Sequence, residues 1–427
     1  MKINLPNFYL LGVLSILLLC SCGAAATPPA ITRTAGAASI NAEYPTPAPI
    51  PPTATPIPSC VFNAVNQAQP NPSISLDSFS FSEPRVLFTN TIPVALSGFF
   101  SQTNLLLTYN RIGIGTGIFR IADPLTKSVA ILKKIENFPS ARTIIPIQNL
   151  NKIVFSFEDV AIRKYRLGVL DLSTLQISQA DLKLQDPYFE LWPDGTDATL
   201  FAAGETGEAI LYNLKSNTAR EIKPSWPPVI AYYDQGHTGY PERLFYKIAA
   251  RPRTNEIIFH DSKRLFLNNL SNTSFCEINL GDIGQATILY AKWSGDGQYL
   301  AIYILPNSFY GAPPYLIVYD ANTGNKNFYF FSNRGIENIE WFPGSHLILA
   351  TIQKSAERTD GNYNILTVLD AETHQVREML PNNVFFAGGY WGTPISSDER
   401  HIAISCPAMT KFEEYSEWRV CVIEVTK

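Results

Sequence analysis

The sequence predicts an all-β protein folded as a seven-bladed β-propeller, in which a strand from near the N-terminus closes the last blade. The first observation is a repeat. Two apolar runs flank a turn made of Asp or Asn with Thr or Ser, and this unit returns roughly every 50 residues. A repeat of this period made only of strands is typical of a propeller, because a four-stranded blade buries both faces only when other blades flank it.

Hairpin turns are the second observation. Asp-Gly or Pro-Gly separates two apolar runs in units such as 291–304 and 339–352, and Gly adopts a positive φ at little cost. The Asx side chain of the repeated turn is able to bond backbone amides inside that turn, so its recurrence needs no ligand. The six Asx anchors are Asp123, Asp171, Asn213, Asn269, Asp320 and Asp370.

A seventh unit starts near Tyr390 and ends after three strands, which we expect at 390–395, 401–406 and 418–425. A blade that lacks its outer strand exposes an unpaired edge. Segment 73–90 has a strand pattern and precedes the first inner strand, expected at 92–99. We therefore expect 73–90 to pair as the outer strand of the last blade.

The unit in the middle of the C-terminal half resembles a known repeat. Residues 293–301 read WSGDGQYLA, and residues 316–324 read LIVYDANTG. This pair of runs resembles the WD40-like repeat, also called PD40-like, of TolB-type propellers, in which Trp-Ser-Pro-Asp-Gly precedes an apolar strand. Degenerate copies start at Trp192 and Trp341. The resemblance covers roughly residues 85–427 and implies a propeller fold, which by itself does not define an activity.

The N-terminus predicts export. Residues 1–21 form a signal peptide with an apolar run that ends in Leu19-Cys20-Ser21-Cys22. This end resembles the bacterial lipoprotein signal, which implies cleavage before Cys22 and lipidation of Cys22. We expect the protein at the outer leaflet of a bacterial membrane, on the cell surface or the periplasmic face, because two or more acyl chains anchor stably. The alternative is a plain secretory peptide with an incidental Cys.

Residues 22–59 predict a tether between the lipid and the propeller. Pro, Thr and Ala dominate this segment, and such a run favours extended polyproline II rather than a packed core. The propeller domain is expected over 60–427.

Four further cysteines are present, Cys60, Cys276, Cys406 and Cys421, and they allow three pairings. We predict a disulfide between Cys406 and Cys421, because two adjacent strands of one hairpin carry them. The pairing of Cys60 and Cys276 stays open, and buried free thiols are the alternative for all four.

Sequence motifs give no catalytic residue, no metal site and no cofactor. The sequence contains no His-Glu-x-x-His, no Gly-x-Ser-x-Gly and, after the signal region, no Cys-x-x-Cys. Segment 360–371 lacks the Gly and Glu of a calcium loop. His346 and His401 are interpreted as hydrogen-bonded core or turn residues. The net charge of −4 and the absence of a basic run argue against nucleic-acid binding.

The loop lengths predict a binding face. Links between second and third strands, and links between blades, open on the same face of a propeller, and four of them are long: 223–243, 305–315, 353–364 and 407–417. Long loops on a rigid scaffold often carry binding sites, and Tyr and Trp favour contact surfaces. The candidate contact residues are Trp226, Tyr232, Tyr233, Tyr240, Phe309, Tyr310, Tyr315, Phe412 and Tyr415. The alternative is that these aromatic residues only pack the loops onto the propeller rim.

The sequence thus predicts a monomeric, lipid-anchored binding or scaffolding module of the cell envelope with a protein or glycan partner, in which 223–243 is the principal contact element. The alternative is an envelope enzyme, a lyase, lactonase or glycan hydrolase, with its site at the mouth of the central channel. Inward carboxylates, His or a cation at that mouth favour the enzyme, whereas apolar and hydroxyl groups favour binding.

Overall fold

The computed structural model divides the chain into two compact units, Met1–Thr55 and Pro56–Lys427, and only the second contains residues whose structure is described. Cys22 and almost all of the expected tether therefore lie outside the described residues. The described ranges are 58–62 and 76–427, without 93, 101–104, 113–115, 137–140, 148–149, 160–163, 181, 183–188, 194–198, 205–208, 223–248, 253, 261–263, 272–273, 282, 284–285, 307–312, 332–334, 354–362, 381–384, 387–393 and 407–417.

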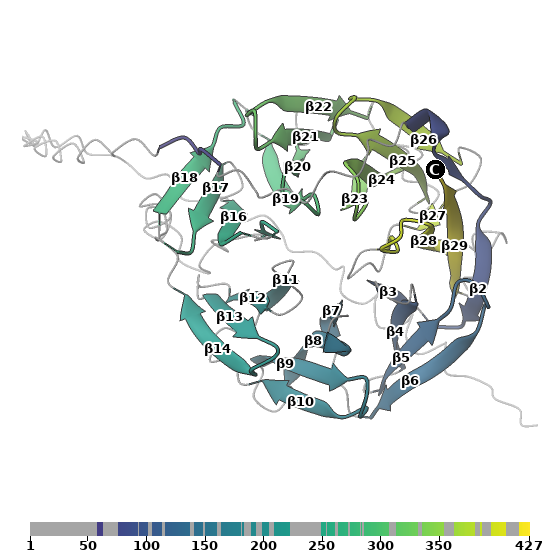
Figure 1. The fold of residues 1–427 in the computed structure, drawn as a ribbon. Coiled ribbons are helices and arrows are strands. Elements are labelled where there is room, and N and C mark those ends of the chain that lie inside the picture. The colour runs from purple at the N-terminus through teal and green to yellow at the C-terminus, as the bar shows by residue number, and fades with distance from the viewer. Residues whose placement is uncertain are drawn as a thin grey trace, which may run out of the picture. The chain divides into compact units, whose positions relative to one another are not determined.

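Seven antiparallel blades form a ring, which confirms the predicted fold (Figure 1). Blade one contains β3 (Ala95–Phe99), β4 (Leu106–Ile112), β5 (Thr116–Ala122) and β6 (Val129–Ile135). Blade two contains β7 (Ala141–Ile147), β8 (Lys152–Asp159), β9 (Lys164–Asp171) and β10 (Ile177–Ala180). Blade three contains β11 (Phe189–Pro193), β12 (Thr199–Gly204), β13 (Ala209–Asn213) and β14 (Thr218–Ile222).

The next three blades follow the same order from the inner to the outer strand. Blade four contains β15 (Ala249–Ala250), β16 (Glu256–His260), β17 (Leu265–Asn269) and β18 (Ser274–Ile278). Blade five contains β19 (Thr287–Trp293), β20 (Tyr299–Leu305), β21 (Tyr315–Asp320) and β22 (Lys326–Phe330). Blade six contains β23 (Ile336–Trp341), β24 (Leu347–Gln353), β25 (Tyr363–Asp370) and β26 (Val376–Met379).

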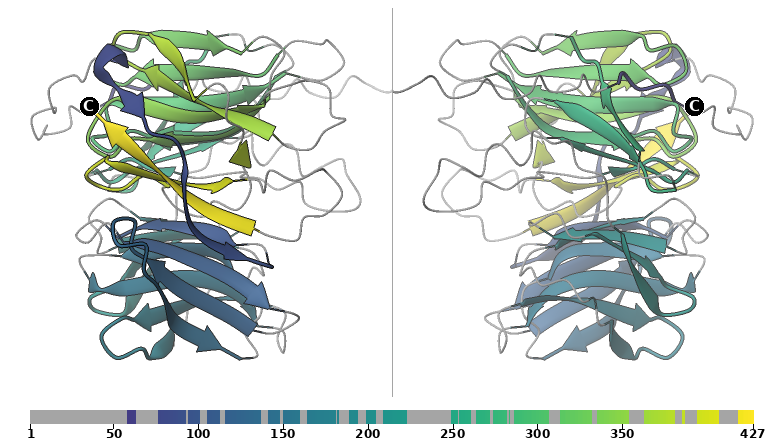
Figure 2. Two further views of the ribbon diagram at one scale, coloured as in Figure 1. Left: turned by 90° about the vertical axis from the view of Figure 1, so that its right-hand side faces the viewer. Right: turned by 90° about the vertical axis from the view of Figure 1, so that its left-hand side faces the viewer.

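Blade seven combines the two ends of the domain. Its C-terminal strands are β27 (Phe385–Phe386), β28 (His401–Cys406) and β29 (Trp418–Thr426). On the far side of β29 lie β1 (Ser80–Phe81) and β2 (Arg85–Asn90), both antiparallel to it. Figure 2 shows these early strands, in dark blue, beside the yellow β29. They occupy the position of the outer strand that the C-terminal unit lacks.

The strand boundaries in this region differ from the expected ones. The inner strand of blade seven begins at Phe385 rather than near Tyr390, and it also pairs with β25 at the loop end of blade six. Residues 387–393 lie outside the described residues, and Ile395 forms an isolated bridge with Ile402. The N-terminal segment opens with a 3₁₀ turn, Leu76–Ser78, and Pro84, which has no N–H to donate, separates β1 from β2.

The Asx turns are built as the sequence predicts. Each of the six Asp or Asn side chains accepts a hydrogen bond from the backbone N–H two residues later, at 2.8–2.9 Å. In the turns of blades one, two, three, five and six the fifth residue has a positive φ, and in blade five it is Gly324 with φ 74°. The matching residues of blades one, two and six are Lys127, Leu175 and His374, where a side chain makes the same backbone less favourable.

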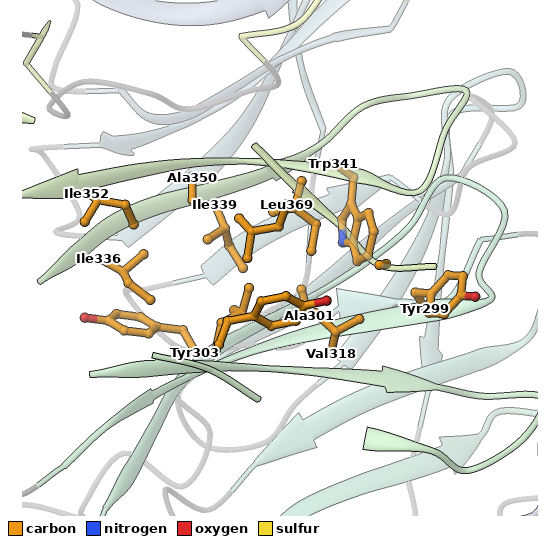
Figure 3. Close-up of a cluster of buried hydrophobic side chains, with 14 of the residues drawn as sticks. Tyr299, Ala301, Tyr303, Val318, Ile336, Ile339, Trp341, Ala350, Ile352 and Leu369 are labelled. Carbon is orange, nitrogen blue, oxygen red and sulfur yellow. The ribbon is translucent and has the colours of Figure 1, made fainter. Parts of the chain in front are cut away.

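The core lies between the blades. Between blades five and six, Tyr299, Ala301, Tyr303 and Val318 pack against a matching apolar set of the next blade (Figure 3). That set contains Ile336, Ile339, Trp341, Ala350, Ile352 and Leu369. The N-terminal segment contributes to the next interface, because Leu76 and Phe79 are buried between blades six and seven.

A second N-terminal piece, residues 58–62, lies on blade four. The Cys60 N–H donates to the Glu277 carbonyl at 3.0 Å, and the Glu277 N–H donates to the Pro58 carbonyl at 2.9 Å. Ser59 therefore forms a parallel bridge with Glu277 on the outer edge of β18. A disulfide joins Cys60 to Cys276, with 4.9 Å between their Cα atoms. Pro58 and Ser59, which the sequence analysis assigned to the tether, thus already contact blade four.

Candidate binding face

The structure describes one of the predicted contact residues, Tyr315. The others lie outside the described residues: Trp226, Tyr232, Tyr233, Tyr240, Phe309, Tyr310, Phe412 and Tyr415. The described strands that flank these links show the face on which each link starts and ends. The links after β20, β24 and β28 join second to third strands, and the link after β14 joins two blades, so all four open on the same face of the ring. We call this side the loop face, and the opposite side the turn face.

Tyr315 belongs to an exposed aromatic cluster at the rim of the loop face. It opens β21 and pairs with Phe330, the last residue of the outer strand β22. Its ring centroid lies 5.2 Å from that of Phe330 and 6.3 Å from that of Phe328. The Phe328 and Phe330 rings lie 6.5 Å apart and nearly parallel, and their residues are 47% and 61% exposed. We call these three residues the aromatic platform.

The local sequence explains why the platform forms. Side chains alternate along a strand, so in β22 Tyr329 faces one way while Phe328 and Phe330 face the other. Tyr329 is buried, its hydroxyl donates to the Asp370 carbonyl at 3.2 Å, and burial raises its pKa to about 12. An apolar patch of aromatic side chains exposed on a strand points to a contact surface. The sequence analysis missed Phe328 and Phe330, although the alternation in 326–330 signals them.

A polar network on the turn face joins blades five and six. Ser294 Oγ donates to Asp296 at 2.6 Å, and His346 Nε2 lies 2.7 Å from the other Asp296 oxygen. His346 Nδ1 bonds Glu372, and the imidazole packs edge-on against Tyr299 with the ring centroids 4.6 Å apart. The interpretation of His346 as a hydrogen-bonded turn residue is therefore confirmed.

Charge and burial in this network oppose each other. Burial disfavours the charged carboxylate of Asp296 and by itself would raise its pKa. The hydrogen bonds from His346, from Ser294 and from the Gln298 N–H outweigh burial and lower the pKa of Asp296 to about 2. Burial likewise disfavours a charged His346, but the two carboxylates of Asp296 and Glu372 raise its pKa above the ordinary value. The network is an ion-paired connection between blades.

The other singled-out histidine, His401, opens β28. Burial lowers the pKa of His401 below its ordinary value, while Asp398 and Glu424 act in the opposite direction. Its backbone N–H donates to Ser396 Oγ at 2.9 Å, whereas Nδ1 has no hydrogen-bond partner within the described residues.

Beside the central axis, the inner strands of blades five and six carry an ion pair. Lys292 Nζ lies 2.7 Å from Glu340 Oε2 and donates to the Ile339 carbonyl at 2.9 Å. Across the described part of the chain, no group of three or more His, Cys, Asp or Glu side chains is arranged to hold a metal ion. None of the helices described there is long and apolar enough to cross a membrane.

A buried arginine fixes the N-terminal segment. Arg251 is fully buried between the rings of Phe62 and Trp293, with its guanidinium carbon 5.1 Å from each ring centroid. Its Nη1 lies 2.6 Å from a Glu256 oxygen. Phe62 and both cysteines of the Cys60–Cys276 bond also pack against the apolar core between blades four and five. No local sequence signal pairs Phe62 with Arg251, because the chain between them is long.

The second disulfide joins Cys406 of β28 to Cys421 of β29, with 6.0 Å between their Cα atoms. Both strands belong to the hairpin that the sequence analysis identified. The pairing in the exported protein stays a prediction that non-reducing peptide mapping tests.

Comparisons with known proteins concern the fold. No family model matches the sequence, and a search of the curated proteins finds no match. Among solved structures, the chain is similar to an oligogalacturonate lyase in complex with manganese, with a TM-score of 0.56 at 12% sequence identity. The similarity covers 82% of this chain and 96% of that one. It supports the seven-bladed propeller, and at this identity it carries no information about activity.

Proposed function

We propose that the protein is a lipid-anchored binding module of the bacterial cell envelope, with TolB-type propeller repeats, which contacts a protein or glycan partner through its loop face. Cys22 carries the acyl chains, and the Pro-rich segment after it holds the propeller away from the membrane. The propeller is the rigid scaffold, and the long links of the loop face with the aromatic platform are the contact elements.

The aromatic platform is the observation that carries this proposal. Phe328 and Phe330 expose about half of their surface or more, and strand pairing with β21 holds their backbone. Large rings on a fixed backbone lose little conformational freedom on binding, so they contribute more net free energy than mobile side chains. Tyr315 belongs to the platform and is also the last residue of the link 305–315, so the platform continues the predicted contact surface of the loop face.

A second candidate is the envelope enzyme that the sequence leaves open, and the lyase with the similar fold supplies one substrate to try, an oligogalacturonate. On the described inner strands Lys292 and Glu340 form an ion pair, and no group of the described residues is arranged to hold a metal ion. Incubation with oligogalacturonate and Mn²⁺ tests this candidate. A lyase leaves an unsaturated sugar product, which absorbs in the ultraviolet, and absence of this product removes the candidate for that substrate.

The binding proposal is tested by a double variant of the platform, Phe328→Ala with Phe330→Ala. We expect the variant to fold like the parent and to lose at least about tenfold in the yield of envelope components cross-linked to it. Two aromatic side chains that the partner buries on binding contribute more than about 1.4 kcal/mol to the binding free energy. The matched control is Val129→Ala with Ile131→Ala, which removes two exposed apolar residues of the outer strand β6. Equal yields for the two variants would contradict the proposal.

A further inference from the structure

The outer edge of blade four shows how this propeller binds an extended segment. Residues 58–60 add to β18 as a short parallel strand, held by both backbone groups of Glu277 and by the Cys60–Cys276 bond. The Glu277 N–H and C=O are available because they point away from β17. Blades one, two, three, five and six repeat the same Asx-turn hairpin, so the equivalent position is identifiable in each of them.

In blade five the equivalent of Glu277 is Phe328. Glu277 is the third residue after Ser274, which pairs with the turn anchor Asn269. In blade five the anchor is Asp320, whose N–H donates to the Asn325 carbonyl at 2.9 Å. Phe328 is the third residue after Asn325. Because hydrogen-bonded pairs alternate in an antiparallel ladder, the backbone groups of Phe328 and Phe330 point away from β21, toward the open edge.

The outer edge of β22 lacks the charged residue that β14 and β26 carry at the equivalent position. Natural proteins place charged side chains on exposed edges, which discourage another strand from pairing. The residue equivalent to Phe328 is Glu221 in β14 and Glu378 in β26. In β18 that residue, Glu277, is covered by the protein's own segment 58–60. In β22, Phe328 and Phe330 place apolar rings there, and no strand of the described residues pairs with this side.

We propose that the outer edge of β22 binds an extended peptide segment of a partner protein, which adds to blade five as a fifth, parallel strand. Backbone hydrogen bonds to Phe328 and Phe330 hold the segment, and its alternate apolar side chains pack on the aromatic platform. This inference rests on the proposed binding function and names its partner class: an uncharged, extended peptide with apolar residues two positions apart.

The register follows from blade four. Ser59 lies beside Glu277. A peptide bound to β22 in the same register therefore places its counterpart of Ser59 beside Phe328 and its counterpart of Val61 beside Phe330. The cysteine between them then faces Asn327, which is the equivalent of Cys276. A disulfide between a peptide Cys and Asn327→Cys therefore reports the proposed strand directly.

The probe is a capped peptide of residues 56–64 in which Ser59→Val supplies the apolar side chain that meets Phe328. The full chain carrying Asn327→Cys is incubated with the peptide in a thiol–disulfide buffer, and the trapped fraction is measured by intact mass. The matched control is Arg220→Cys, at the equivalent position of β14, where Glu221 replaces Phe328. A scrambled peptide with its Cys in the same place controls for thiol reactivity.

We expect at least about fivefold more trapping at Asn327→Cys than at Arg220→Cys, and a fall to the control level when Phe328→Ala and Phe330→Ala are added. An equal trapped fraction at both sites, or a trapped fraction that does not change when the two Phe substitutions are added, would overturn the inference. Platform-dependent binding to immobilised glycans without peptide trapping would also overturn it, and would make the platform a carbohydrate site. If trapping fails while the platform variant still loses its envelope partners, the proposed function stands and only the strand addition is lost.

Discussion

Arg251 of blade four donates a hydrogen bond from Nε to the carbonyl oxygen of Gly297 in blade five, at 2.9 Å. The first hairpin turn of one blade thereby bonds the first hairpin turn of the next. Blades six and seven repeat this relationship, because the Gly344 N–H donates to Glu399 Oε1 at 2.5 Å. On the turn face, polar contacts therefore join each pair of neighbouring blades from blade four to blade seven, whereas the loop face carries the long links.

The buried ion pair at Arg251 predicts a large loss of stability on substitution. Arg251→Met removes the cation and leaves the Glu256 carboxylate buried without it, which costs about 3–5 kcal/mol of the free energy of unfolding. Urea denaturation followed by tryptophan fluorescence measures this loss. Lys134→Met is the control, because the Lys134–Glu136 pair is exposed and should change the same free energy by less than about 1 kcal/mol. Similar losses in both variants would contradict the role of Arg251.

Two buried serines predict opposite outcomes for the same substitution. Ser97 Oγ has no hydrogen-bond partner in the described part of the chain, whereas Ser156 Oγ accepts a bond from the Thr143 N–H at 3.1 Å. Ser97→Ala should be neutral or stabilising, since it removes an unsatisfied buried hydroxyl. Ser156→Ala should cost about 1–3 kcal/mol, since it leaves the Thr143 amide unsatisfied. The prediction fails if thermal melting ranks the two variants in the reverse order.

The network at His346 predicts a pH-dependent contribution to stability. Because the fold raises the pKa of His346 above 6.5, the contribution of His346 is complete below that pH and is lost as the pH rises through the folded pKa. Because the fold lowers the pKa of Asp296 from 3.8 to about 2, the contribution of Asp296 is present above 3.8 and is lost as the pH falls toward 2. The groups that face the imidazole are Asp296, Glu372 and the Tyr299 ring.

His346→Gln should therefore destabilise the protein most between about pH 4 and pH 6.5, by about 1.5–3 kcal/mol for bonds to charged groups. The difference between parent and variant should shrink on both sides of this window. Denaturation midpoints measured in a single buffer series provide the comparison. A difference that stays constant from pH 3 to pH 9 would contradict the charged network.

The turns show what the sequence alone predicts well. An Asx turn depends on a side chain and the backbone two residues later, so the turns at Asp320 and its equivalents are predictable from a few neighbouring residues in the sequence. The count of blades follows from these anchors. The two phenylalanines of the platform also have a sequence signal, because Phe328 and Phe330 alternate with a buried Tyr329.

Contacts between segments that are far apart in the sequence are not predictable from local sequence in the same way. Cys60 and Cys276 are separated by 216 positions, and no periodicity relates the end of a Pro-rich segment to blade four. The Phe62–Arg251–Trp293 contact depends on that same docking. The early start of the last blade at Phe385 follows from its pairing with β25 of the preceding blade, which is a tertiary contact.

Residues 76–90, which contain β1 and β2, should be required for the closure of the ring. Phe79 is fully buried, with its ring centroid 5.2 Å from that of Phe342, and Arg377 donates to the Phe79 and Leu76 carbonyls. Phe79→Ala should cost about 3–5 kcal/mol, and deletion of 73–90 should remove cooperative melting because β29 loses its outer partners. A deletion variant that melts like the parent would show that β1 and β2 do not close the last blade.

Photo-cross-linking in cells at Phe330 tests the central claim, binding through the loop-face rim, most directly. A photoreactive phenylalanine analogue replaces Phe330 in one strain and Ile131, on the outer strand of blade one, in another. The account predicts a discrete cross-linked species of the membrane-anchored protein from position 330, and none from position 131. Cross-links at 131 equal to those at 330, or no cross-link at 330 in a protein that is exported and folded, would contradict it.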